Sequence, residues 1–162
     1  MQSGHPTSPG PRRHVKADAV AKEPYLIWNA FIDLVAMEDY ETLTAVQRPA
    51  HLAFHYDAEV MNGGHHQYFE NRAGQHSQET IDALLQLGLK CQAELLRAAI
   101  MSWNSKERQS TVTAEDFLEG ELEREFESHD KRYEECNPTT NEGMERYLGE
   151  HQSDFVIVEG AA

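Results

Sequence analysis

Apolar residues recur three or four positions apart through most of the chain from residue 25 onward, which is the spacing of one helix face. Residues 25–38 begin this pattern, and Pro24 precedes them at a position where a first helical turn accepts proline. Residues 49–62, 78–90 and 91–103 repeat it. The spacing therefore predicts four amphipathic helices that bury one face in a shared core.

Three shorter segments complete the predicted fold. We expect a short helix over residues 65–71, an acidic helix that begins at a cap on Thr113, and a last helix near the C-terminus. Ser77, with Thr80 as the alternative, is the expected cap of the helix that follows it. Strand-like alternation is confined to residues 155–158. The sequence thus predicts an all-α fold, a single compact domain of six to eight helices.

Composition divides the chain into a tail and a domain. Residues 1–23 are rich in Pro, Ser and Gly, so we expect a disordered N-terminal tail before an all-helical domain over residues 24–158. The tail lacks the apolar stretch of a secretory signal, and no apolar run approaches the roughly 18 residues of a membrane span. We therefore expect a cytoplasmic protein. Cys91 and Cys136 have no metal-type spacing, so free thiols are expected, with one disulfide as the alternative.

Negative charge is concentrated in the C-terminal part of the chain, which carries a formal net charge of −14 in all. Residues 1–113 contribute 13 acids and 10 Lys or Arg, whereas residues 114–162 contribute 15 acids and only 4 Lys or Arg. Phosphates would repel such a surface, so we expect no direct binding to nucleic acid and no binding to an anionic membrane. A basic protein is the partner that this charge favours.

The stretch MNGGHHQYFENR, residues 61–72, holds two adjacent glycines, two adjacent histidines and an aromatic pair. It lacks the glycine and lysine spacing of a phosphate-binding loop. Asn and Gly tolerate positive φ, so a joint between two helices explains the glycines, with the aromatic pair packed into the core. The residues of this predicted structural motif are Asn62, Gly63, Gly64, Gln67, Tyr68, Phe69 and Asn71.

His51, His55 and Glu59 are spaced four residues apart and therefore share one helix face. Two histidines and a carboxylate can bind zinc or iron, which leaves a metal-dependent enzyme as one alternative. No HExxH motif supplies a general base beside them, and solvated or capping histidines explain the same pattern. No GxSxG nucleophile motif occurs either. We therefore predict no catalytic residue, no bound metal and no cofactor.

Residues 59–71 follow the order acidic-x-x-Asn-Gly-Gly and then Gln-aromatic-Phe-x-Asn, which resembles the hallmark of a bacterial DNA-mimic-protein family. Further matching positions are Trp28, Ala83, Leu84, Gly88 and residues 130–133, and the resemblance spans roughly residues 25–156. One difference is His65, where the family usually has an apolar residue. The resemblance implies an all-α, non-enzymatic protein. In the best-understood case it also implies a homodimer whose carboxylates imitate DNA phosphates and bind a DNA-binding regulator.

The acidic stretch after residue 114 has a charge density close to that of one DNA strand. Its seven acids are Glu115, Asp116, Glu119, Glu121, Glu123, Glu125 and Glu127. In a helix they would span roughly 18 Å, or about one charge per 3 Å, compared with ~3.4 Å along one DNA strand. Leu118, Leu122 and Phe126 form a stripe that can be buried between two carboxylate rows. We predict that these acids bind the partner, and a purely solvated acidic face is the alternative.

Three functions are compatible with these patterns. The favoured one is a non-enzymatic acidic interaction module, a DNA mimic that binds a basic DNA-binding protein. The second is an immunity-type inhibitor of a basic toxin or nuclease, for which the same acidic surface would serve. A neighbouring toxin gene would favour this function, and a neighbouring regulator gene would favour DNA mimicry. The third is a metal-dependent enzyme that uses the histidine cluster of His51, His55 and Glu59.

Overall fold

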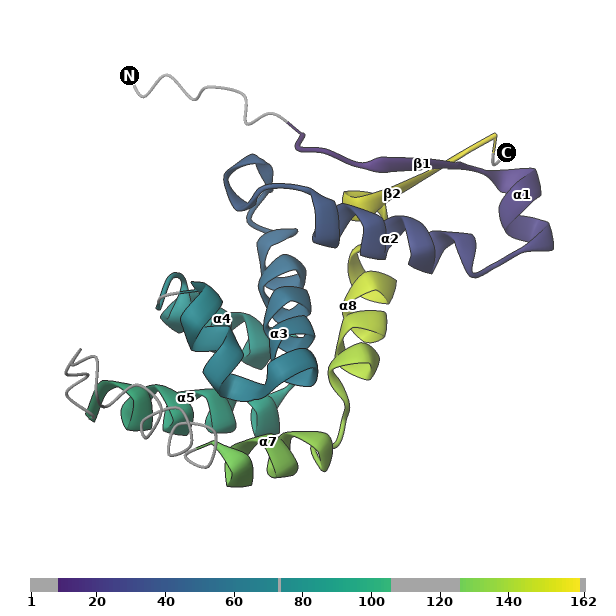
Figure 1. The fold of residues 1–162 in the computed structure, drawn as a ribbon. Helices are drawn as coiled ribbons and strands as arrows, with labels where there is room; N and C mark the ends of the chain where they lie inside the picture. Colours follow the sequence, from purple (N-terminus) through teal and green to yellow (C-terminus); the bar gives the residue numbers. More distant parts are fainter. Residues whose placement is uncertain (1–8, 73, 106–125, 161–162) are drawn as a thin grey trace, which may run out of the picture.

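The computed structural model describes residues 9–72, 74–105 and 126–160 (Figure 1). In chain order the elements are β1 (Arg13–Lys16), α1 (Ala17–Lys22), α2 (Leu26–Met37), the 3₁₀ turn η1 (Tyr40–Thr42), α3 (Arg48–Arg72), α4 (Ser77–Gln86), α5 (Lys90–Ser105), α7 (Glu127–Glu134), α8 (Thr140–Phe155) and β2 (Val156–Glu159). Seven α-helices in the described ranges confirm the predicted helical domain, to which the structure adds a two-stranded parallel sheet. None of these helices is long and apolar enough to cross a bilayer.

Helix α3 is the centre of the fold, because it contacts α2, α4, α5, α7 and α8 (Figure 1). Its first half carries Ala53, Tyr56 and Val60 on one face, and all three side chains are buried. This is the stripe that the spacing in residues 49–62 predicted. The predicted helices over residues 25–38 and 91–103 likewise correspond to α2 and α5.

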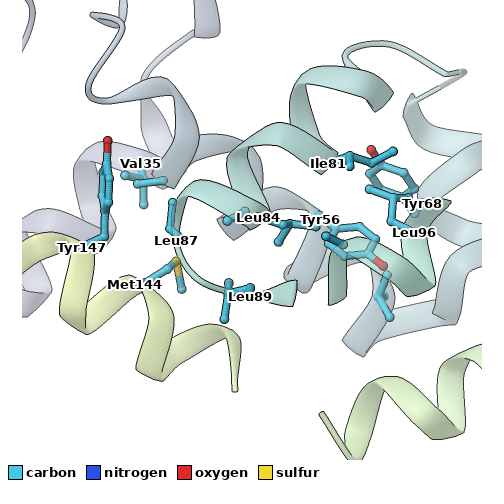
Figure 2. Packing of buried hydrophobic residues seen from close by; sticks show 14 of the residues in the cluster. Val35, Tyr56, Tyr68, Ile81, Leu84, Leu87, Leu89, Leu96, Met144 and Tyr147 are labelled. Atoms are coloured by element: carbon cyan, nitrogen blue, oxygen red, sulfur yellow. The ribbon is translucent and has the colours of Figure 1, made fainter. Parts of the chain in front are cut away.

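Side chains from five helices form one hydrophobic core (Figure 2). Val35 comes from α2, Tyr56 from α3, Leu84 from α4, Leu96 from α5 and Met144 from α8. Each of the five is at most 1% exposed. Because α3 supplies residues to this core from both of its halves, the shape of α3 decides how the other helices are placed.

Residues 13–22 differ from the predicted disordered tail, because they form β1 and α1. Strand β1 pairs in parallel with β2, so that Arg13 lies opposite Val156. The Arg13 guanidinium also binds Asp33 at 2.6 Å and Glu38 at 2.8 Å, which fixes the strand against α2. Local composition did not predict this strand, since its hydrogen-bond partner lies at the other end of the chain.

The start of α4 also differs from the prediction. Ser77 is the first residue of the helix, and His76 occupies the cap position in a left-handed conformation with φ of 56°. The Ser77 hydroxyl donates a hydrogen bond to the carbonyl of Gly74, so it does not cap the helix amides. Thr80, the alternative cap, lies inside α4 and donates its hydroxyl to the carbonyl of His76.

The expectation of two free thiols is wrong, because Cys91 and Cys136 form a disulfide. Cys91 lies in the first turn of α5, and Cys136 lies just after α7. The packing of α7 against α5 brings the two Cα atoms to 5.7 Å, which is within the range that a disulfide spans. The bridge therefore joins residues that the sequence separates by 45 positions.

Candidate functional site

The glycine pair of the MNGGHHQYFENR stretch interrupts α3. Gly63 has φ of −144° and ψ of 21°, and Gly64 has φ of 73° and ψ of −177°. The second conformation is one that glycine alone adopts readily. A Cβ atom on Gly64 would also overlap the Asp130 carboxylate of α7. The two glycines therefore let α3 change direction and let α7 approach the bend closely.

Glu59, before the bend, accepts hydrogen bonds from two side chains that follow the bend. Gln67 Nε2 donates to it at 2.7 Å and Asn71 Nδ2 at 2.8 Å, while Asn62 Nδ2 donates to Gln67 Oε1 at 3.1 Å. Burial alone would raise the pKa of Glu59, but these hydrogen bonds, together with the nearby Arg72 guanidinium, lower it. The polar residues of the stretch thus join the two halves of α3.

The aromatic pair of the stretch lies in the core. Tyr68 is 3% exposed and Phe69 is 1% exposed. The Phe69 ring stacks on the Trp103 ring of α5, with the two centroids 5.0 Å apart and the planes 20° apart. These contacts fix the second half of α3 against α5, and they require no chemistry of the aromatic groups.

His65 is completely buried, at the position where the family resemblance leads us to expect an apolar residue. Its Nε2 atom lies 2.6 Å from the Tyr56 hydroxyl, and its Nδ1 atom lies 2.6 Å from Asp130 Oδ1. The backbone amide of His65 donates to the same Asp130 oxygen at 2.9 Å. Burial would raise the pKa of Asp130, but the two hydrogen bonds from His65 outweigh it and lower that pKa. His65 therefore connects α3 to α7.

Hydrogen bonds connect Asp130 to His65 and His65 to Tyr56. This acid–histidine–hydroxyl order is that of a catalytic triad, but the burial of the hydroxyl does not suit catalysis. The Tyr56 hydroxyl would have to act as the nucleophile, and this side chain is 0% exposed. Burial raises the pKa of Tyr56 well above its ordinary value, which disfavours the phenolate. The three residues form a structural connection between helices.

The residues of the predicted histidine cluster each bind protein groups. His51 Nδ1 bonds to the carbonyl of Val35 at 2.9 Å, and His55 Nδ1 bonds to the Arg72 guanidinium at 3.0 Å. Glu59 is occupied by the amides described above. Among residues 9–72, 74–105 and 126–160, no three His, Cys, Asp or Glu side chains are placed to hold a metal ion. The arrangement gives no support to the metal-dependent alternative.

His51 and His55 line a cavity of about 280 Å³ together with Tyr40, Arg72 and His76. The His51 and His55 rings lie 4.3 Å apart, and the Tyr40 and His76 rings lie 4.0 Å apart. Burial, followed by the effect of His51 and Arg72, lowers the pKa of His55 to about 4. At neutral pH this side chain is therefore uncharged, and its Nδ1 accepts a hydrogen bond from Arg72.

This low pKa predicts a loss of stability in mild acid. The unfolded chain binds a proton at His55 near pH 6.5 and the folded chain only near pH 4, so the free energy of unfolding falls as pH decreases between these values. We expect His55→Gln, which cannot be protonated, to reduce the fall by roughly 1–2 kcal/mol at pH 5. Urea unfolding at pH steps from 7.5 to 4.5 measures it. Equal pH dependence in the two proteins would contradict the assignment.

Of the seven acids predicted to bind the partner, only Glu127 falls in the described ranges, and it is an exposed residue at the start of α7. The others, Glu115, Asp116, Glu119, Glu121, Glu123 and Glu125, lie outside the described residues. Residues 126–160 nevertheless carry nine acids and three Lys or Arg. Eight of these acids are exposed: Glu127, Glu134, Glu135, Glu142, Glu145, Glu150, Asp154 and Glu159.

Most of the exposed carboxylates form no ion pair with another described residue. Glu159 pairs with His14 at 2.9 Å, and Asp154 lies 3.8 Å from His151. The capping box at the start of α8 uses Glu142, which accepts from the amide of Thr139 at 3.0 Å. The remaining five form no salt bridge within the described part of the chain: Glu127, Glu134, Glu135, Glu145 and Glu150. Residues 126–160 therefore have a formal net charge of −6, because their nine acids outnumber Lys131, Arg132 and Arg146.

Sequence reasoning missed the contacts that place α7 and α8 against α3. The Tyr133 hydroxyl donates to Asp57 Oδ1 at 2.6 Å and bonds with Thr140 Oγ1 at 2.8 Å. The only signal in the sequence was that residues 130–133 resemble further family positions. No spacing rule relates Asp57 to Tyr133, because they are 76 residues apart.

Comparison with known proteins identifies one family. A family model described as DMP19-like protein matches residues 41–151, which extend from η1 into α8 and include the glycine joint and Asp130. The chain matches no curated protein and no solved structure. The match covers more than half of the chain and includes every contact of the joint described above.

Proposed function

The chain belongs to the DMP19-like protein family, and we propose that it is a non-enzymatic DNA mimic that binds a basic DNA-binding protein. The family takes its name from DNA mimic protein 19, so membership suggests mimicry of DNA and a DNA-binding protein as partner. The contact surface we propose is the acidic C-terminal surface, which comprises the acids of residues 115–127 and the exposed acids of α7 and α8.

The uncompensated charge of this surface is the observation that carries the proposal. Residues 114–162 hold 15 acids and 4 Lys or Arg. Five exposed glutamates, four on α7 and α8 and one directly after α7, form no salt bridge within the described ranges. Like charges on neighbouring helical turns destabilise a helix, so these glutamates do not contribute to the stability of the fold. Carboxylates accept the charge-assisted hydrogen bonds that Arg and Lys otherwise make to DNA phosphates.

The structure around the glycine joint supports a non-enzymatic role. His65 and Asp130 bind each other and Tyr56 in the interior, and His51, His55 and Glu59 bind protein groups. These residues determine the course of α3 and the position of α7 beside it. The joint thereby positions α7, which carries Glu127 and Glu134, and the proposed recognition takes place on the carboxylates.

Charge reversal tests this surface. We expect the triple variant Glu119→Lys, Glu123→Lys and Glu127→Lys to bind the partner at least about tenfold more weakly, because each change replaces attraction with repulsion. Binding of the unmodified protein should weaken steeply as salt rises from about 0.05 to 0.5 M. The assay is capture of basic DNA-binding proteins from a host lysate, eluted with a salt gradient and identified by mass spectrometry.

The control is a second triple variant of equal net charge, Glu23→Lys, Glu79→Lys and Glu94→Lys, whose changes lie on exposed positions outside the acidic C-terminal surface. It should retain most of the capture. Equal losses in the two variants would show that only net charge matters, and capture that is insensitive to salt would contradict an electrostatic interface.

A further inference from the structure

A cavity of about 270 Å³ lies where α3, α5, α7 and α8 meet, and it is distinct from the cavity of the histidine cluster. Asp57 and Met61 of α3, Gln92 of α5, Glu134 of α7 and Thr140 of α8 line it, together with Tyr133. Glu134 is also part of the acidic C-terminal surface. The cavity therefore opens beside the carboxylates that we propose contact the partner.

The charged groups of this cavity are both acids. Asp57 and Glu134 line it, and the described lining includes no lysine, arginine or histidine. Neither carboxylate forms a salt bridge within the part of the chain that the structure describes. A cation in the cavity would therefore meet two acceptors that have no competing positive partner.

Gln92 adds a buried acceptor to the wall of the cavity. The residue is 1% exposed, and its Nε2 atom donates to the carbonyl of Pro138 at 2.7 Å. Its Oε1 atom has no hydrogen-bond partner among the described residues. Buried side-chain oxygens are normally paired, so a donor is missing at this oxygen of a residue that lines the cavity.

The Asp57 carboxylate is held in a fixed orientation. The Tyr133 hydroxyl donates to its Oδ1 atom at 2.6 Å, and Thr140 bonds to the same hydroxyl at 2.8 Å. Within the described residues no group donates to Oδ2, which can accept from a ligand. Met61, which is 59% exposed, contributes an apolar side chain to the same cavity. The cavity thus combines fixed acceptors with an apolar wall.

We propose that this cavity binds an arginine side chain of the basic partner, an inference that rests on the proposed function. A guanidinium offers five N–H donors in a fixed plane, enough for Asp57, Glu134 and Gln92 together, whereas a lysine ammonium offers three donors from one point. The aliphatic stem of arginine suits the wall formed by Met61. The first turn of α8 also borders the cavity, and the Glu142 carboxylate of its capping box offsets the positive end of that helix.

The experiment compares two labelled peptides of equal charge, one with four arginines and one with four lysines, each alternating with glycine. Fluorescence anisotropy should show that the unmodified protein binds the arginine peptide about tenfold more tightly. The variant Asp57→Asn with Glu134→Gln should bind both peptides with similar affinity. The matched control is Glu145→Gln with Glu150→Gln, which removes two exposed acids of α8 that do not line the cavity. It should weaken the binding of both peptides equally and so preserve the ratio of their affinities.

Asp57→Asn also alters the hydrogen bond between Asp57 and Tyr133 and could disturb the fold. The second test is therefore Glu134→Gln alone, because Glu134 is exposed and its replacement leaves that bond intact. It should reduce the preference for arginine by about threefold or more. Equal affinity of the two peptides for the unmodified protein, or a preference that survives in Asp57→Asn with Glu134→Gln, overturns the cavity proposal. Salt-dependent binding of both peptides would then still support the proposed function. Binding of neither peptide contradicts both proposals.

Discussion

Replacing Gly64 with alanine is expected to lower the free energy of unfolding by about 3 kcal/mol or more. Two causes act together. The backbone of Gly64, at φ of 73° and ψ of −177°, lies in a region that residues with a side chain rarely adopt. The new Cβ atom would also overlap the Asp130 carboxylate, which binds the ring and the amide of His65. The substitution therefore disturbs both the bend in α3 and the attachment of α7.

Gly74→Ala is the matched control for this prediction. Gly74 also has a positive φ, 76°, but apart from its two chain neighbours no atom of the described residues lies within 4 Å of the position that its Cβ would occupy. It should show the cost of backbone strain alone, about 1 kcal/mol. Urea unfolding of both variants, monitored by circular dichroism, gives the comparison. If Gly64→Ala were no more destabilising than Gly74→Ala, the close contact with Asp130 would not matter to the fold.

Loss of the Cys91–Cys136 disulfide is expected to lower the free energy of unfolding by about 2–4 kcal/mol. The bridge closes a loop between residues separated by 45 positions, and opening a loop of this length gives the unfolded chain much more conformational freedom. The bond also ties the residue two positions after α7 to the first turn of α5.

Urea unfolding with and without a reducing agent measures the effect of the disulfide. The control is the variant Cys91→Ala with Cys136→Ala, whose stability should be low and should not respond to the reductant. Titration of thiols in the denatured, unreduced protein should find none. Two titratable thiols, or equal stability of the reduced and unreduced protein, would show that the bridge is not part of the native structure.

The sequence predicted the helices well where one apolar face repeats over several turns. Residues 49–62 and 65–71 were predicted as two helices joined at Asn62-Gly63-Gly64, and the structure has α3 bent at Gly63 and Gly64. The strand-like residues 155–158 largely coincide with β2. These features depend on neighbours within a few positions, which is the range over which a sequence pattern carries direct information.

Contacts between distant residues could not be predicted in this way. Strand β1 forms because β2 pairs with it, and the disulfide forms because α5 and α7 pack together. The partner of His65 is Asp130, 65 positions away, and neither residue has a neighbour that indicates the pairing. His65 shows the limit most clearly. Its sequence position suggested a departure from an apolar site, whereas the structure satisfies both ring nitrogens in the interior.

The most direct test of the central claim is displacement of a DNA-binding protein from DNA. A host lysate is loaded on DNA-cellulose at about 0.1 M salt, a range in which phosphate contacts still dominate retention. The column is then washed with the purified protein or with the variant Glu119→Lys, Glu123→Lys and Glu127→Lys. A DNA mimic should release a specific basic protein that the variant leaves bound. If both proteins release the same material, or neither releases any, the acidic C-terminal surface does not act in place of DNA.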